Sequence, residues 1–181
     1  MRKLIALLLA ASFILAACGA SAQPTAAPNP EQPNPNEPNP TKLPLPDSAT
    51  SNPEHLAKLK EGVEAWNAWR AQNAGIKPDL TRADLTKQNL ADFDFTSANM
   101  IKANLSNANL SRAIFRGANL TGANLSGARL KNAKLINTRL SGADLSGADL
   151  TGAKLTGATY DAATVWPTGF DPVAAGATLE Q

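Results

Sequence analysis

The chain has 181 residues, with 17 lysines and arginines against 15 aspartates and glutamates, one histidine and one cysteine. This length has room for one domain with accessory segments. A single cysteine excludes an internal disulfide, and the near balance of charge argues against a general attraction to nucleic acid or to an anionic surface.

Residues 1–17 are expected to be a secretory signal peptide. Arg2 and Lys3 precede an apolar run that is too short to span a bilayer as a stable helix. The run ends in Leu-Ala-Ala-Cys, which resembles the bacterial lipobox, where the chain is cut before a cysteine that is then diacylated and N-acylated. The resemblance predicts lipidation, with palmitate-type chains, at Cys18. The alternative is an ordinary signal peptide that happens to end in a cysteine.

Cleavage before Cys18 is expected to leave a membrane-anchored lipoprotein with 15 basic and 15 acidic residues. Several acyl chains hold a protein on a membrane well, since each buried methylene adds about 0.8 kcal/mol. The expected location is therefore extracytoplasmic, with membrane lipid as one partner. Gly19 follows the cysteine where some enterobacterial lipoproteins carry an inner-membrane retention aspartate, and this resemblance favours the outer membrane or the periplasmic face.

Residues 18–52 are rich in proline, asparagine, alanine and serine. Ten of the 13 prolines lie between Pro24 and Pro53, and this composition favours an extended backbone with little apolar surface to bury. The segment is predicted to be a disordered tether. A proline-rich ligand for a partner or for the cell wall is the alternative.

A capping helix is predicted over residues 53–75. Asn52 is suited to the N-cap position, Pro53 to the first helical position, and Gly75 is a plausible stop. One apolar side carries Leu56, Leu59, Val63, Trp66 and Trp69. Such a helix must pack on something else to be stable. His55, the only histidine, is expected to be a solvated surface residue.

From Leu80 onward a large apolar residue recurs at every fifth position. All 17 such positions up to Tyr160 are large and apolar, 13 of them are leucine, and alanine stands two residues before 13 of them. The exceptions at this second position are Pro78, Gln88, Phe93 and Thr138. A period of five gives no stripe on an α-helix and alternates between faces on a flat strand. The pattern predicts a chain that turns a corner once per five residues, with the leucine and alanine inside.

The units ANLSN, ANLTG, ADLSG and ADLTG resemble pentapeptide repeats of the A(D/N)LXX type. The resemblance covers residues 78–165 and implies an all-β solenoid, a right-handed quadrilateral β-helix with four units per coil. The predicted 53–75 helix is expected to be its N-terminal capping α-helix. Residues 166–181 are expected to form the C-terminal cap and tail, because both ends of such a stack need covers.

With four units per coil, residues 20 apart are expected to share a column on one outward face. One predicted column holds Asp84, Asn104, Asn124 and Asp144, and another holds Asp94, Ile114, Lys134 and Lys154. A modest basic edge results, with Arg112, Arg116, Arg129 and Lys131 nearby. The plain interpretation is a solvated face, since Asp149 interrupts it and no aromatic residues are interleaved for bases to stack on.

The best-known activity implied by the family, mimicry of DNA against gyrase, does not suit this chain. Residues 79–161 hold ten basic and seven acidic residues, which is the wrong sign, and a signal peptide sends the protein elsewhere. No catalytic, metal-binding or cofactor-binding residues are predicted, although the pair Asp92 and Asp94 could in principle act as acid and base.

Two functions of different classes remain. The first is a lipid-anchored, non-catalytic interaction or structural module that docks an unknown envelope protein or polymer. The second is a small-ligand or hydrolytic site at an end of the solenoid, built around Trp166 and Asp171 or around the helix tryptophans.

Overall fold

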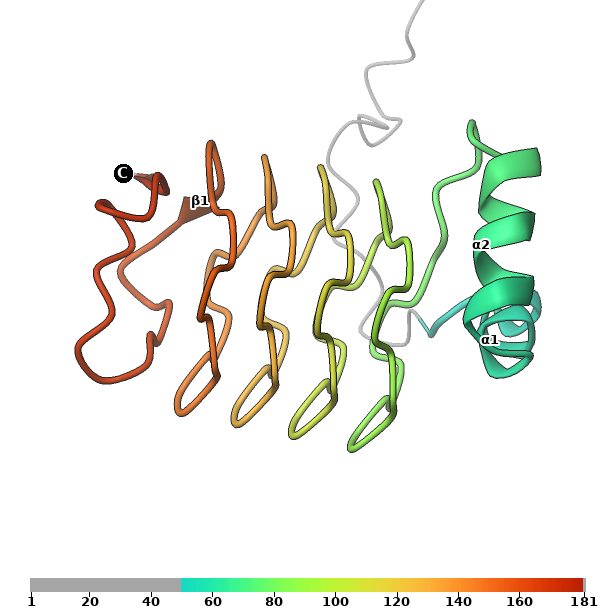
Figure 1. The fold of residues 1–181 in the computed structure, drawn as a ribbon, viewed down its shortest axis with the longest axis horizontal. Helices are drawn as coiled ribbons and strands as arrows, with labels where there is room; N and C mark the ends of the chain where they lie inside the picture. Colours follow the sequence, from blue (N-terminus) through green and yellow to red (C-terminus); the bar gives the residue numbers. More distant parts are fainter. Residues whose placement is uncertain (1–49, 181) are drawn as a thin grey trace, which may run out of the picture. The chain divides into compact units, whose positions relative to one another are not determined.

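The computed structural model describes residues 50–180. The signal peptide, Cys18 and nearly all of the 18–52 tether lie outside the described residues. The described part consists of two short helices followed by a regular solenoid (Figure 1). Neither helix is long and apolar enough to cross a membrane.

The N-terminal segment forms two helices where the sequence predicts one. α1 spans Pro53–Lys60 and α2 spans Val63–Gln72. Gly62 between them has a φ of 101°, a left-handed conformation that cannot continue a helix. The N-cap prediction is confirmed, because the side chain of Asn52 accepts hydrogen bonds from the amides of Glu54 and His55.

The predicted stop at Gly75 is wrong. α2 ends at Gln72, and its C-cap is Asn73, whose side-chain amide donates to the Trp69 carbonyl at 2.9 Å. The apolar side was predicted correctly: Leu59 and Trp66 are buried, and Leu56, Val63 and Trp69 are partly buried against the same core.

The solenoid begins near Pro78 and advances by one coil every 20 residues. Parallel bridges join each outward residue before an inward leucine to the residue 20 positions later, starting at Asp79↔Asn99 and running unbroken to Arg139↔Thr159. Figure 1 shows the successive coils side by side along one axis. The predicted stacking of residues 20 apart is therefore confirmed.

Every corner of a coil is a tight turn closed by a backbone hydrogen bond, such as that from the Ala83 amide to the Leu80 carbonyl at 3.0 Å. The third residue of each turn has a positive φ, at 16 consecutive corners from Arg82 to Gly157. This conformation suits glycine or asparagine, which explains the frequent Gly after Ser or Thr in the repeat.

The inward positions form one continuous core. The large residues from Leu80 to Leu155 are buried, and Tyr160 at the end of the series is partly buried. Among the exceptions to alanine, Gln88 is exposed, whereas Thr138 is fully buried and its hydroxyl donates to the Phe115 carbonyl at 2.7 Å. A polar side chain is accommodated there because its donor is satisfied.

The C-terminal segment adds one more rung to the parallel pairing between coils before the solenoid ends. β1 (Thr159–Tyr160) pairs in parallel with β2 (Thr178–Leu179). The step just before is 21 residues, at Asp144↔Val165. Asp161 and Thr164 accommodate the extra residue by accepting hydrogen bonds from the Gly142 amide.

Candidate functional site

The aspartates and asparagines of the repeat help to close its turns. At Asn119, for example, the side-chain oxygen accepts the Thr121 amide at 3.0 Å and the Thr121 hydroxyl at 2.6 Å. The same amide contact is made by Asp79, Asp84, Asp94, Asn99, Asn104, Asn109, Asn124, Asp144 and Asp149. These side chains therefore do a local structural task, typical of Asx turns.

At two of these positions hydrogen bonding also favours the ionised carboxylate. The Thr86 hydroxyl lowers the pKa of Asp84, and the Thr151 hydroxyl does the same for the pKa of Asp149. A carboxylate held in its charged form is a poor proton donor, so these positions are unsuited to general acid chemistry.

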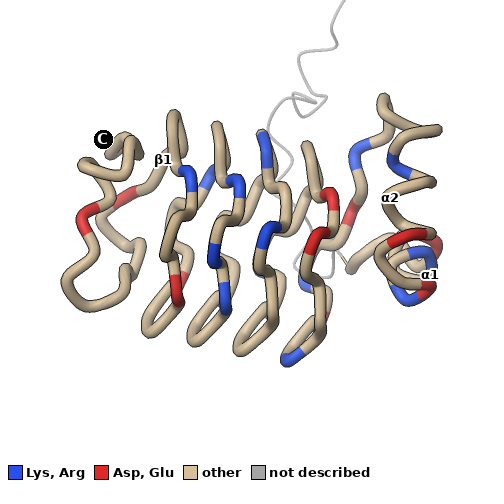
Figure 2. The backbone as a smooth tube through the Cα atoms, viewed as in Figure 1, with Lys and Arg blue, Asp and Glu red and all other residues tan. Residues whose placement is uncertain are grey.

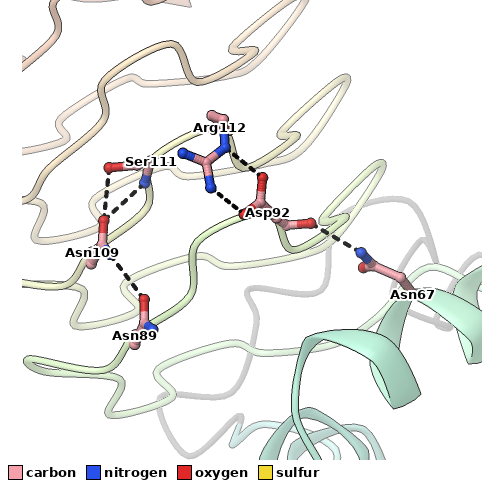
Figure 3. A network of polar contacts seen from close by, with 6 residues as sticks. All are labelled: Asn67, Asn89, Asp92, Asn109, Ser111 and Arg112. Atoms are coloured by element: carbon pink, nitrogen blue, oxygen red, sulfur yellow. Dashed lines mark hydrogen bonds and ion pairs between the residues drawn. The ribbon is translucent and has the colours of Figure 1, made fainter.

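The pair Asp92 and Asp94 is separated by the fold. Figure 3 shows Asp92 at a corner, where Arg112 of the next coil binds its carboxylate through Nε at 2.8 Å and through Nη2 at 2.5 Å. The hydrogen bond from Arg112 lowers the pKa of Asp92. Asp94 is on the adjoining face and accepts the Thr96 amide at 2.8 Å. The two carboxyl groups therefore have separate partners and do not form an acid and base pair.

Amide side chains also bridge neighbouring coils near this corner. Asn109 donates to Asn89 at 2.9 Å, and Asn67 of α2 donates to the Asp92 carbonyl at 3.0 Å (Figure 3). Asn67 also accepts the Asp94 amide at 2.9 Å. The first coil is thus hydrogen bonded both to the second coil and to α2.

The predicted column that contains Asp94, Ile114, Lys134 and Lys154 is present in register. Arg116 follows Ile114 by two residues and lies in the corner turn that ends this side, where the Ala118 amide donates to the Phe115 carbonyl. We call Arg116, Lys134 and Lys154 the basic face. Each is exposed, and none of these side chains has a hydrogen bond or an ion pair with another residue in the 50–180 range. Figure 2 shows mostly blue segments on the coils that follow the first one, with a red segment on a later coil, whereas the first coil carries both red and blue segments.

A groove follows the corner next to the basic face. It encloses about 440 Å³ and is lined by Lys77, Ser97, Ala98, Asn99, Ile101, Gly117, Asn119, Asn137 and Arg139. Two of these residues are cations, four have neutral polar side chains, and none is acidic. The groove is not predictable from the columns of the sequence alone, because they do not show that glycine at residue 117 leaves space at the corner.

The helix tryptophans are used in packing. Trp66 is fully buried, lies 5.8 Å from Phe95 between ring centroids, and donates through Nε1 to the Asp94 carbonyl at 2.7 Å. Arg70 is also buried and donates to the carbonyls of Ile76 and Thr96. Burial lowers the pKa of Arg70. The role of this arginine was not predicted, because its place in the sequence is that of an ordinary polar residue of a helix.

The expectation that His55 is a solvated surface residue is wrong. The ring is partly buried 5.3 Å from Trp69, and its Nδ1 accepts the Asp79 amide at 3.0 Å. His55 therefore joins the start of α1 to the start of the solenoid. The sequence feature that indicates this role is the position of His55 in the first helical turn, beside the N-cap residue. Asn52 also contacts the first coil, since its amide donates to the Asp79 carbonyl at 3.0 Å.

The residues suggested for a C-terminal site also make local contacts. Trp166 stacks on Phe170 at 5.3 Å and meets the edge of Tyr160 at 5.4 Å. Asp171 accepts the amides of Val173 and Ala174, which closes a turn. A shallow hollow of about 340 Å³ lies beside them, lined by residues that include Asp149 and Phe170 but neither Trp166 nor Asp171. The proposed pair does not converge on one space.

Within the described part of the chain, no three His, Cys, Asp or Glu side chains are grouped so as to hold a metal ion. Cys18, the predicted lipidation site, lies outside that part. The outward surface of the described part includes the basic face and its groove, which is lined by two cations and four neutral polar side chains.

Comparison with known proteins agrees with this architecture. The family model for pentapeptide repeats matches residues 79–117 and 118–157, in eight copies. The solved pentapeptide repeat protein alr5209 from Nostoc Pcc 7120 is 38% identical, with a TM-score of 0.58, and the match covers 63% of this chain and 93% of that one. Comparison with curated proteins gave no match.

Two further solved structures match smaller parts. Rfr23 from the cyanobacterium Cyanothece 51142 is 41% identical over 50% of this chain and 66% of that one, with a TM-score of 0.46. A pentapeptide repeat protein of the Arabidopsis thaliana thylakoid lumen is 34% identical over 45% and 60%, with a TM-score of 0.37. The chain belongs to the pentapeptide-repeat family, and its repeats form the right-handed quadrilateral β-helix of that family.

Proposed function

We propose that this protein is a lipid-anchored module of the cell envelope that presents a non-catalytic β-helix to a binding partner. One observation carries the proposal: the outward side chains stand in straight columns at a 20-residue register, while the carboxylates among them are largely bonded within the turns. Such a surface is suited to recognition along its length.

The anchor is supported by the N-terminal sequence. Leu-Ala-Ala-Cys ends an apolar run that follows Arg2 and Lys3, and Cys18 is the only cysteine. The proline-rich segment 18–52 then acts as the tether between the acylated cysteine and the solenoid. At about 3 Å per residue its 35 residues reach roughly 100 Å when fully extended.

We further propose that α1 and α2 cap the first coil. The contacts that support this role are the buried Trp66 against Phe95, the hydrogen bonds of Asn67 to the backbone on both sides of Phe93, and the His55 bond to Asp79. A cap protects apolar side chains and backbone groups that the end of a repeat stack otherwise exposes.

The anchor is tested with Cys18→Ala, compared with Ser21→Ala as a matched control that leaves the lipobox intact. Cells are fractionated and the protein is labelled metabolically with a palmitate analogue. We expect the wild type and Ser21→Ala to be labelled and to sediment with membranes. Cys18→Ala should lose the label and either leave the membrane fraction or remain unprocessed. Processing and membrane retention of Cys18→Ala equal to the wild type would contradict the anchor.

The interaction role is tested by photo-crosslinking in intact cells. A photoreactive residue is placed at Ile114, on the column of the basic face, and in a second strain at Asn124, on the column two faces away. A defined crosslinked partner from one column and not from the other supports a recognition surface. Identical diffuse crosslinking from both columns contradicts it.

A further inference from the structure

The basic face places two like charges in direct register without an acid between them. Lys134 and Lys154 are partners in the parallel ladder, and adjacent strands are about 4.8 Å apart. Like charges directly opposite each other destabilise a sheet. The only acid in this column, Asp94, is separated from Lys134 by Ile114.

Some cations elsewhere on the solenoid are set against acids. Arg112 binds Asp92, and Arg129 is the ladder partner of Asp149, whose pKa is lowered in part by Lys131 and Arg129. Arg116, Lys134 and Lys154 have no such partner within residues 50–180. No acid of the described residues therefore neutralises the positive charge of these three side chains. The ligand that complements them is an anion.

The groove beside this face extends the positive surface around the corner. Gly117, which lines the groove, directly follows Arg116, and Asn137 and Arg139 lie one coil further along. Lys77 stands at its start. The remaining polar side chains of the lining are hydroxyl and amide groups, from Ser97, Asn99 and Asn119. Hydroxyl and amide groups exchange hydrogen bonds with hydroxyl groups of a ligand, and the two cations attract its acidic groups.

We infer that the basic face and its groove bind an acidic polysaccharide strand, whose acidic groups meet Arg116, Lys134, Lys154 and Arg139 and whose hydroxyl groups meet the amides of the groove. An anionic lipid bilayer is a flat surface that can contact the basic face but cannot enter the groove at the corner. A single-stranded nucleic acid favours aromatic platforms, and the groove lining contains no aromatic residue. The inference rests on the proposed function, since it names the class of envelope partner that the anchored module binds.

The test measures binding of the full-length protein, purified in mild detergent, to a fluorescently labelled oligogalacturonate. The variant Arg116→Gln/Lys134→Gln/Lys154→Gln removes three charges from the face. The control Lys60→Gln/Lys87→Gln/Lys102→Gln removes the same charge from exposed positions elsewhere. We expect at least a tenfold rise in Kd for the face variant, less than a threefold rise for the control, and no binding of neutral dextran by the wild type.

A second variant, Arg139→Gln, tests the groove separately, and we expect a rise in Kd of threefold or more. Equal losses in the face variant and the control indicate general charge attraction and overturn the inference. Binding to vesicles containing phosphatidylglycerol, or to a single-stranded oligonucleotide, without binding to oligogalacturonate also overturns it. Circular dichroism on each variant confirms that the fold is intact, since all the changed side chains are exposed.

A negative result for polysaccharide binding can be distinguished from a negative result for the anchor, because the Cys18→Ala fractionation does not depend on any ligand. If the protein is labelled and membrane-bound but does not bind oligogalacturonate, the proposed anchor is supported and only the proposed partner is contradicted. If the protein binds oligogalacturonate but is not acylated, the proposed binding face is supported and the proposed anchor is contradicted.

Discussion

The first and last corners of the solenoid adopt the same backbone with different residues. The first seven positive-φ positions, from Arg82 to Arg112, contain no glycine, whereas seven of the nine from Gly117 to Gly157 are glycine and the other two are asparagine. For residues other than glycine this conformation costs roughly 1–2 kcal/mol each, and less for asparagine. The N-terminal coils therefore carry more backbone strain than the C-terminal coils.

The strained corners have two compensations. The side chains at two of these corners interact across coils, through the Arg112 bond to Asp92. The first coils also contain the aromatic contacts of the core, in which Phe95 lies 5.2 Å from Phe115 and 5.8 Å from Trp66. The difference indicates that support from α2 and the aromatic residues permits side chains at corners that glycine would otherwise occupy.

The largest effect is expected from removing the packing of α2 against the first coil. Trp66→Ala should lower the free energy of unfolding by about 3–5 kcal/mol, because it empties a fully buried site and leaves the Asp94 carbonyl without its donor. Urea unfolding gives the total loss, and hydrogen exchange shows where it falls. We expect the amides of the first coil to lose more protection than those of the last.

Trp166→Ala is the matching change at the opposite end. It should weaken the last coil and leave the first coil protected, because Trp166 contacts Tyr160 and Phe170. If Trp66→Ala loosens all coils equally, the support is not local. If Trp166→Ala leaves the last coil as protected as in the wild type, a packing role for this tryptophan is wrong.

A smaller effect is expected from exchanging corner residues within one column. Lys87 and Gly147 occupy equivalent corners three coils apart and have φ values of 59° and 65°. Gly147→Ala should cost about 1 kcal/mol, because a Cβ there meets nothing closer than 4.0 Å and only the conformation is penalised. Lys87→Gly should stabilise by about 0.5 kcal/mol, since relief of strain exceeds the added freedom of the unfolded chain.

Thermal and urea unfolding measure both changes, and Lys87→Ala is the control. Alanine removes the lysine side chain but keeps a Cβ at the left-handed position, so it should not stabilise. Stabilisation by Lys87→Ala equal to that by Lys87→Gly would attribute the effect to the lost charge and contradict the strain argument.

The smallest effect concerns the ion pair at the strained corners. The hydrogen bond from Arg112 holds the pKa of Asp92 below its ordinary value, so the pair stabilises the fold above the unfolded pKa of about 3.9 and this contribution is lost as pH falls through the folded pKa. Asp92→Asn should therefore be less stable than the wild type at pH 7, and the difference should shrink as pH falls below the unfolded pKa of about 3.9. The size is expected to be modest because both side chains are exposed.

Unfolding curves at pH 7, 5 and 3 measure this difference. Glu64→Gln, which changes an exposed acid in the first turn of α2, serves as the control. A gap between Asp92→Asn and the wild type that persists unchanged at pH 3 would show that the ionised pair is not its source.

The sequence predicts the solenoid well because a single rule governs it. Leu85 or Leu125 must face inward and each unit must turn a corner, so the period of five determines the coils and the columns. The helix break at Gly62, the ladder contact of Leu179 and the role of His55 depend on the geometry of the ends, where no repeat applies. Local propensities do not specify which surfaces meet there.

The candidate surface was predicted only in part. The register of Lys134 and Lys154 follows from counting by 20, but their lack of partners depends on where Asp94 and Asp149 direct their carboxylates. The adjoining groove depends on the absence of a side chain at Gly117 next to the long side chain of Arg139. Such relations appear only when neighbouring coils are placed against each other.

The 20-residue register also constrains how proteins of this kind can change in length. Inserting one five-residue unit between two coils keeps every leucine inside, yet it rotates everything downstream by a quarter turn about the axis. Lys134 and Lys154 would then stand beneath a different column, and Asp94 would lose its place above them. A gene that gains or loses single repeats can thus reassemble its surface pattern in one step without disturbing its interior, and only changes of four units preserve an existing recognition face.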